Sequence, residues 1–182
     1  RIKHDALSQA LTRFGVPDGM LQMIEGIYSS RTFVVRGSTQ ESTVHRQNAG
    51  IAQGCPLSPY LFIMVMTVIL KDAQELRRRS TEEKPYIVTP SVVYADDTML
   101  LGSSAKDVQS HFDAIVAVGR SYGLELNLGK TVVLKIRGDE CLTGSDGHAL
   151  QEKDKAVYQG GLLSIDGRPV GELKRRLGEA RS

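Results

Sequence analysis

The sequence predicts an α+β fold with an antiparallel sheet packed on helices. Helical periodicity and period-two periodicity alternate irregularly along the 182 residues, which is typical of hairpins packed on helices rather than of repeated strand-helix-strand units. The clearest pair of strands covers residues 92–94 and 99–101, because each is a short apolar run and a polar bend separates them. No internal repeat or low-complexity tract interrupts the pattern.

Composition leaves the class of function open. The chain has 23 Lys and Arg against 21 Asp and Glu, and this net charge of +2 neither requires nor excludes a nucleic-acid partner. Its 2 cysteines and 4 histidines are scattered, so no zinc site or disulfide framework is predicted. The most apolar run, residues 60–70, is too short to span a bilayer, and we expect no membrane partner.

Two helices and a hairpin are predicted at the start of the chain. Apolar residues recur at helical spacing over residues 4–14, and a second helix follows with Asp18 as its cap. Residues 32–36 and 42–46 then read as an exposed hairpin that carries Arg31, Arg36 and Arg46. Its basic residues suit a nucleic-acid backbone, but they equally suit an edge strand that avoids aggregation.

A loop over residues 50–59 leads into a long helix. Ser58 is placed as the N-cap and Pro59 as the first helical residue, and the helix runs to about residue 79. Its first half is apolar nearly all round, so we expect it to lie under a sheet, and we expect residues 71–79 to face water.

The second half of the chain repeats the mixture of short strands and helices. A strand near residues 86–89 precedes the hairpin, and a helix begins at Ser104, which has capping-box spacing to Asp107, and ends at Gly123. The rest of the chain is predicted to contain two strands, over residues 132–136 and 157–164, with a loop over 137–155 between them. A turn at 166–167 and a basic helix follow. The helix presents Leu173, Leu177 and Ala180 on one face.

Two adjacent carboxylates, Asp96 and Asp97, lie at the bend between the clearest pair of strands. A buried carboxylate pair is costly unless a basic group or a metal ion neutralises it. Aspartate is also an ordinary turn residue. These residues alone therefore leave a metal site and a plain turn as equal alternatives.

Four blocks of residues decide between them, because together they resemble the reverse transcriptases of non-LTR retrotransposons and group II introns. Across nearly the whole chain and in the same order, the sequence resembles conserved blocks of that family at residues 50–62, at Tyr94-Ala95-Asp96-Asp97, at residues 123–131 and at residues 158–168. Tyr-x-Asp-Asp alone is a weak pattern, whereas four ordered blocks are a strong one.

The resemblance implies a right-hand polymerase palm with part of the fingers and the start of the thumb. Residues 1–136 are then the palm with partial fingers, residues 137–155 a loop or insertion, and residues 156–182 the palm-thumb hairpin and the first thumb helix. The implied activity is RNA-directed DNA polymerisation, with an RNA template, a DNA primer and deoxynucleoside triphosphates as partners. Action in the nucleus is implied by the resemblance alone.

The resemblance also assigns roles to six residues. Asp96 and Asp97 are implied to be catalytic ligands of Mg²⁺, or alternatively Mn²⁺, in two-metal-ion chemistry. Lys130 is implied to lie near the triphosphate, although a solvated lysine explains it equally well. Substrate binding is implied for Gln53, Gly54 and Tyr94, although a helix-entry turn would account for the first two and packing for Tyr94.

Departures from the family pattern limit the expectation. An earlier block of the family supplies a further metal-binding aspartate, and the chain starts after it at Arg1, so we expect a truncated piece that does not polymerise alone. Ala52 stands where many relatives are basic, and Gln159 replaces an apolar residue, which hints at sequence decay. The alternative function is a degenerate, non-catalytic module that binds RNA.

Overall fold

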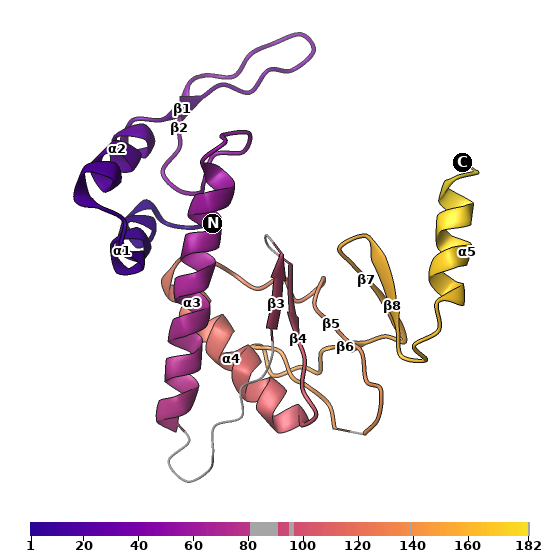
Figure 1. Ribbon diagram of the computed structural model, residues 1–182. Coiled ribbons are helices and arrows are strands. Elements are labelled where there is room, and N and C mark those ends of the chain that lie inside the picture. Colours follow the sequence, from indigo (N-terminus) through magenta and orange to yellow (C-terminus); the bar gives the residue numbers. More distant parts are fainter. Residues whose placement is uncertain (81–90, 95–96, 139, 182) are drawn as a thin grey trace. The chain divides into compact units, whose positions relative to one another are not determined.

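The computed structural model describes residues 1–80, 91–94, 97–138 and 140–181 (Figure 1). Its internal contacts divide the chain into two compact units. The first comprises Arg1–Lys84 and Ala114–Glu125, and the second comprises Pro85–Asp113 and Leu126–Ser182. Helices dominate the first unit and two-stranded sheets the second, so the predicted α+β class is confirmed.

Three helices form the core of the first unit, and their positions confirm the predicted ones. They are α1 (His4–Phe14), α2 (Asp18–Ser29) and α3 (Ser58–Ser80). Helix α3 packs on α1 (Figure 1). The side chains that this packing removes from water include Leu7, Ala10, Leu11, Ile24, Leu61, Val65 and Ile69. Burying an apolar side chain of this size contributes about 1.5–3 kcal/mol, so this helix interface is the main source of the unit's stability.

Two local predictions for these helices are wrong. Asp18 is the first helical residue rather than the cap, since Pro17 occupies the cap position and no side chain caps α2. The second half of α3 is not fully solvated, because Ala73 and Arg77 are buried. Within the first unit, the apolar face of α3 packs against α1.

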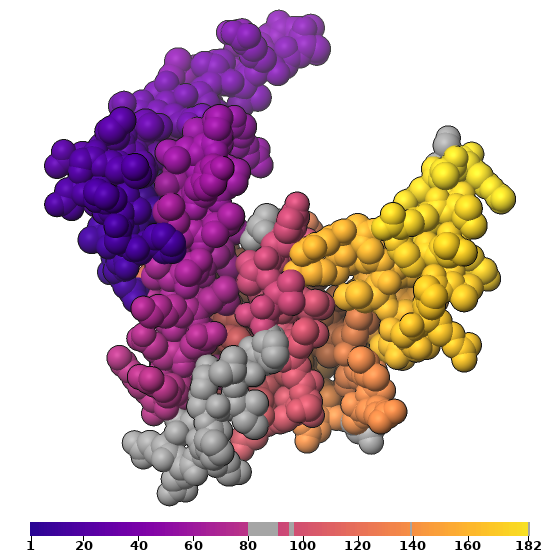
Figure 2. Space-filling view, in the orientation of Figure 1, coloured from indigo at the N-terminus to yellow at the C-terminus, as the bar shows by residue number. Residues whose placement is uncertain are grey.

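The predicted exposed hairpin follows α2 and is confirmed. Strands β1 (Thr32–Phe33) and β2 (His45–Arg46) pair antiparallel, with Thr32 opposite Arg46. Beyond the two-residue ladder, a bridge between Arg36 and Glu41 closes the distal end. Figure 2 shows this segment as a narrow arm of the first unit. The ladder is shorter than predicted, and the side chains of residues 32–46 are exposed except for that of Ser42, which is half-buried.

The end of α4 (Ala105–Ser121) closes the first unit against the chain start. Gly123 adopts a positive φ of 80°, and the Leu124 N–H donates to the Gly119 carbonyl at 2.9 Å, which ends the helix as predicted. A Cβ at Gly123 would lie 2.7 Å from the Arg1 carbonyl oxygen, so only glycine fits there. The amino terminus of Arg1 in turn donates to the Gly123 carbonyl at 2.9 Å.

A polar network joins α1, α3 and the residue after α4. The Arg13 guanidinium donates to both carboxylate oxygens of Asp72 and, at 2.7 Å, to the hydroxyl of Tyr122. That hydroxyl donates to Asp72 at 3.3 Å. The hydrogen bonds from Arg13 lower the pKa of Asp72, and burial raises the pKa of Tyr122. Three segments far apart in sequence are therefore held at one point.

The second unit contains the predicted central hairpin, β3 (Ser91–Tyr94) and β4 (Asp97–Leu100), which pair antiparallel. The start of α4 follows, and the Asp107 N–H donates to the Ser104 hydroxyl at 3.4 Å, as the capping pattern predicted. His111 is buried on α4, which the apolar pattern missed. The strand predicted near residues 86–89 lies outside the described residues.

The sheet is not antiparallel throughout. Strands β5 (Val132–Val133) and β6 (Gln151–Glu152) pair parallel, and β6 lies within the stretch predicted as a loop. Parallel pairing needs a long connection, which the residues between the two strands provide. Strand 132–136 is accordingly shorter than predicted, because its only ladder is this two-residue pair in the described part of the chain.

The strand predicted at residues 157–164 is instead a hairpin of β7 (Lys155–Tyr158) and β8 (Gly161–Ser164). Gln159 and Gly160 form its turn with φ of 50° and 74°, as a type I′ turn requires. Gln159 is exposed there, so the expectation that it replaces a buried hydrophobe is wrong. The predicted turn at Gly167 is confirmed by its N–H donating to the Ser164 carbonyl at 3.0 Å.

The final helix, α5 (Val170–Glu179), contacts β8 through polar groups. Glu172 accepts the Leu162 N–H at 2.9 Å and pairs with Arg175 and Arg176, which together lower its pKa to about 2. The predicted apolar face exists but is exposed, with Leu173 64% and Leu177 51% accessible. Among the described residues, no helix is long and apolar enough to cross a membrane.

We predict that Asp72→Asn lowers the free energy of unfolding by about 1–2 kcal/mol, because it weakens hydrogen bonds to a charged group that is half exposed. The matched control is Glu41→Gln, whose pair with Arg36 is largely exposed and contributes close to zero. Chemical denaturation at pH 7 measures both. Equal losses in the two variants would contradict the prediction.

The same network makes stability depend on pH. Because the folded pKa of Asp72 lies below its unfolded value of about 3.9, its contribution is present above that value and is lost as the pH falls through the folded pKa. The stability difference between the wild type and Asp72→Asn should therefore shrink on acidification from pH 7 to about pH 2. A difference that stays constant over this range would argue against it.

We also predict that Gln159→Asn stabilises the β7-β8 hairpin by up to about 1 kcal/mol, since asparagine tolerates positive φ better than glutamine. Gln151→Asn, on exposed strand β6, is the control and should not stabilise the chain. Thermal unfolding measures both variants, and a lower midpoint for Gln159→Asn would refute this account of the turn.

Candidate functional site

The β3-β4 hairpin presents an exposed carboxylate. Tyr94 ends β3 and lies opposite Asp97, which begins β4, and the two residues between them, including Asp96, lie outside the described residues. Directly opposite residues in an antiparallel pair share a face, so Tyr94 and Asp97 project to the same side of the hairpin. Asp97 is exposed, and its side chain forms no hydrogen bond or ion pair with any described residue.

The packing explanation for Tyr94 is wrong, because this side chain is 63% exposed. The described hairpin residues are half-buried or exposed, so Asp97 carries no large burial cost. The hairpin is held by a hydrogen bond from the Tyr158 hydroxyl to the Val92 carbonyl at 2.9 Å, which ties β7 to β3.

The second part of the candidate site is the tip of the loop before α3, at Gln53 and Gly54. Gly54 has a φ of 79°, a conformation that favours glycine, and a Cβ there would meet no atom within 4 Å. Both residues are exposed, and within the described chain no hydrogen bond engages the Gln53 amide. The tip therefore offers an open backbone and a free amide to a ligand.

The loop around this tip is firmly held on both sides. Upstream, the Gly50 N–H donates to the Ile2 carbonyl at 2.7 Å, and the Gly50 carbonyl accepts from Gln47 Nε2 at 3.0 Å. Downstream, the Ser58 hydroxyl donates to the Ala52 carbonyl, and the Ser58 N–H donates to the Cys55 carbonyl at 3.0 Å. Ser58 is the first residue of α3, so the prediction that it caps the helix before Pro59 is wrong, and its hydroxyl fastens the loop instead.

Two further contacts to this loop come from side chains to which the sequence analysis assigned no functional role. The Ala52 N–H donates to the Tyr28 hydroxyl at 3.4 Å, and His4 Nε2 lies 3.3 Å from the Gly50 carbonyl oxygen. The His4 and Tyr28 rings meet edge to face, with centroids 5.5 Å apart. Helical spacing identified Tyr28 as a core residue, but no sequence signal showed which loop its hydroxyl meets.

Lys130 lies in a turn before β5. Its N–H donates to the Asn127 carbonyl at 3.0 Å, and its side chain is exposed and free of ion pairs with described residues. This environment fits both a solvated lysine and a cation available to a ligand. No described hydrogen bond or ion pair joins Lys130 to Asp97.

The predicted residues with described positions are divided between the two units. Gln53 and Gly54 share one loop of the first unit, and Tyr94 and Asp97 share one hairpin end of the second, which also contains Lys130. Among the residues with described positions, which exclude Asp96, no group of three or more His, Cys, Asp or Glu side chains is arranged to hold a metal ion.

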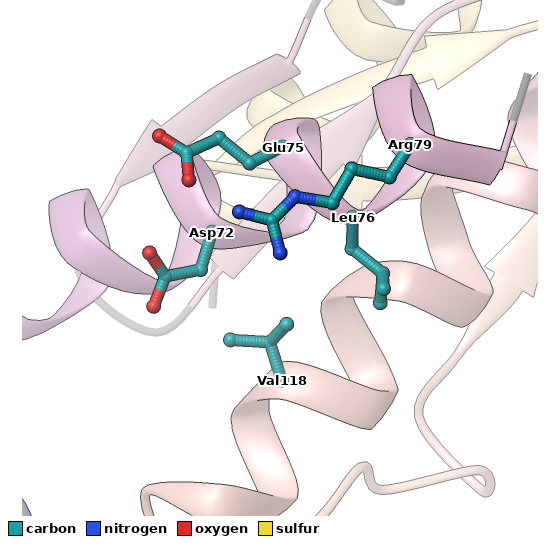
Figure 3. Close-up of a pocket in the computed structure, with 5 residues that line it drawn as sticks. All are labelled: Asp72, Glu75, Leu76, Arg79 and Val118. Carbon is teal, nitrogen blue, oxygen red and sulfur yellow. The ribbon is translucent and has the colours of Figure 1, made fainter.

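A shallow hollow of about 260 Å³ lies elsewhere in the first unit and contains none of the predicted site residues. Four of its lining side chains come from α3 and one from α4: Asp72, Glu75, Leu76, Arg79 and Val118 (Figure 3). Asp72 is already engaged by Arg13, and we assign the hollow no role.

Comparison with known proteins bears on these residues. The sequence model described as "Reverse transcriptase (RNA-dependent DNA polymerase)" matches residues 1–160. A retrovirus-related Pol polyprotein from type-1 retrotransposable element R2 of Popillia japonica is 33% identical over 69% of this chain. The corresponding R2 polyprotein of Nasonia vitripennis is 30% identical over 69%, and that of type-2 element R2DM of Drosophila melanogaster is 26% identical over 75%. The chain spans only 21%, 12% and 13% of these relatives, respectively.

We predict that Gly54→Ala destabilises the chain by about 1 kcal/mol, because an L-residue with a positive φ is strained even where space is open. Gly26→Ala is the control: it also enters open space, but in the regular helix α2, where alanine is favoured by up to about 1 kcal/mol. Urea unfolding distinguishes them. Equal effects of the two substitutions would show that the Gly54 backbone is not constrained.

Proposed function

Because this chain belongs to the reverse transcriptase (RNA-dependent DNA polymerase) family, we propose that it supplies the catalytic palm of an RNA-directed DNA polymerase, with part of the fingers and the start of the thumb. Residues 1–136 form the palm and partial fingers in this proposal. Residues 137–155 are a connecting insertion, and residues 156–182 are the palm-thumb hairpin with the first thumb helix. The proposed reaction joins a DNA primer to a deoxynucleoside triphosphate on an RNA template.

The observation that carries the proposal is the exposed, unengaged carboxylate of Asp97 at the end of a two-stranded hairpin. An ordinary turn aspartate is usually occupied by nearby backbone N–H groups, as Asp166 is by that of Arg168 at 3.0 Å. Asp97 has no such partner among the described residues, so its oxygens are available to a ligand. The neighbouring Asp96 doubles the negative charge in the sequence.

These carboxylates fit a hard divalent cation, since Mg²⁺ binds one or two protein carboxylates together with substrate phosphates. Asp96 and Asp97 would hold Mg²⁺, or Mn²⁺ in its place. When bound, the metal ions neutralise charge on the attacking and leaving oxygens of the transferred phosphate. The resemblance implies a further metal-binding aspartate, a role that we assign to none of the other aspartates of this sequence.

The remaining residues have binding and proton-transfer roles in the proposal. The Gln53 amide and the open backbone at Gly54 contact template or nucleotide, because both are exposed on a loop held at both ends. Tyr94 offers an exposed ring on the face that carries Asp97. Lys130 is the candidate to protonate or neutralise the leaving pyrophosphate, since its ammonium group is solvent-accessible and unpaired among the described residues.

We predict that this 182-residue chain does not extend a primer by itself, and that a longer protein containing it does so on an RNA template. In the longer protein, Asp96→Asn and Asp97→Asn should each reduce extension at least about a hundredfold, because each removes a charge that holds the metal ions. The measurement is primer extension with Mg²⁺ and, separately, with Mn²⁺.

The control for these variants is Asp18→Asn, which removes the same charge from the first turn of α2 and should leave extension unchanged. Template-primer binding without extension by the unaltered longer protein would favour the non-catalytic RNA-binding module instead. Full activity of Asp96→Asn would exclude the catalytic assignment.

A further inference from the structure

The loop between Gly50 and Ser58 combines a fixed base with an exposed tip. Its base is fixed by backbone and side-chain hydrogen bonds at Gly50, Ala52 and Ser58. Its tip residues, Gln53 and Gly54, are exposed, and the Gln53 amide has no partner among the described residues. A binding group gives higher affinity when surrounding contacts fix its position before the ligand arrives, because less entropy is lost on binding. The contacts at the base of the loop therefore affect how tightly the tip can bind a ligand.

The contact with Tyr28 holds the N–H of Ala52, the residue next to the tip, whereas Ser58 and Cys55 hold its carbonyl. Tyr28 is 2% exposed and Ala52 is 4% exposed, so water does not readily replace either partner. The Ala52 N–H is the one described hydrogen-bond partner of the Tyr28 hydroxyl, at 3.4 Å. A buried donor that loses its acceptor bears the cost of desolvation without compensation, so a long hydrogen bond at this place still constrains the backbone.

His4 supports Tyr28 from the neighbouring helix. The two rings pack edge to face with an interplanar angle of 61°, and His4 Nε2 also reaches the Gly50 carbonyl oxygen at 3.3 Å. The two side chains therefore hold the loop two residues apart, at Gly50 and at Ala52. Both helices that carry them belong to the rigidly packed core of the first unit.

We propose that Tyr28 is a positioning residue for the Gln53-Gly54 tip, acting through the Ala52 N–H, with His4 as its support. The Tyr28 hydroxyl fixes the peptide that joins Ile51 to Ala52, and the Ser58 hydroxyl holds the next peptide at the Ala52 carbonyl. The two contacts together set the direction in which the Gln53 side chain is presented. Tyr28 itself touches no substrate. This inference rests on the proposed function, in which the tip contacts nucleic acid or nucleotide.

The first test is amide hydrogen exchange by NMR on the whole chain. Tyr28→Phe removes the hydroxyl and keeps the ring, so exchange at the Ala52 amide should accelerate roughly fivefold. The Gly50 amide, which donates to the Ile2 carbonyl at 2.7 Å, should exchange as in the wild type and thereby shows that the unit remains folded. His4→Phe keeps the ring contact and should have a smaller effect at Ala52. Unchanged exchange at Ala52 in Tyr28→Phe overturns the proposal.

The second test is a double-mutant cycle on binding of a labelled RNA template annealed to a DNA primer, measured by fluorescence anisotropy. Tyr28→Phe should weaken binding roughly fivefold, and it should add nothing in the Gln53→Ala background, because its effect passes through that side chain. Tyr60→Phe, at an exposed tyrosine of α3, should bind like the wild type. If Tyr28→Phe weakens template-primer binding equally in the wild-type and Gln53→Ala backgrounds, Tyr28 does not act through the Gln53 side chain, and the proposal is overturned.

The two tests separate this inference from the proposed function. If the unaltered chain does not bind the template-primer, the proposed function fails, and the substrate role of the tip fails with it. Accelerated exchange at Ala52 would in that case still establish Tyr28 as the anchor of the loop. If binding is intact and exchange at Ala52 does not change, the proposed function stands and the positioning role falls.

Discussion

The burial of α3 against α1 is the constraint on which the first unit depends. Leu61, Val65 and Ile69 are inaccessible along one face of α3, and this fixes where both ends of that helix lie within the unit. At the N-terminal end, Ser58 fastens the loop that carries Gln53 and Gly54. Further along, Asp72 joins Arg13 and Tyr122 in a network that binds α1 and the end of α4 to the same helix. The packing therefore supports the candidate binding loop directly.

The two halves of the candidate site share a physical pattern, although they lie in different units. Each presents an unengaged polar side chain, Gln53 in one and Asp97 in the other, beside a backbone held by hydrogen bonds. A polar side chain without a protein partner contributes nothing to folding stability, whereas its fixed backbone reduces the entropy that a ligand must remove on binding. This is the arrangement expected of groups that serve a ligand rather than the fold.

Local patterns predicted the helices well, because their signals are short in range. The end of α4 at Gly123 and its start at Ser104 follow from residues within one turn of each terminus. Predictions that depend on partners distant in sequence fared worse. The parallel pairing of β5 with β6 joins Val132 to Gln151, which are far apart in sequence. The exposure of Leu173 depends on what packs on α5. Local periodicity encodes neither feature. The contact of Tyr28 with Ala52 is of the same kind.

The two substitutions that suggested sequence decay have local structural explanations. Ala52 is buried against the Tyr28 hydroxyl, where a basic side chain would have to be accommodated at the cost of burying its charge. Gln159 occupies an exposed turn position with positive φ, where a large apolar side chain would gain little from burial and would be strained as well. Burial at the first position and a positive φ at the second therefore limit which side chains each position can accept, and both limits come from the local structure rather than from any role in catalysis.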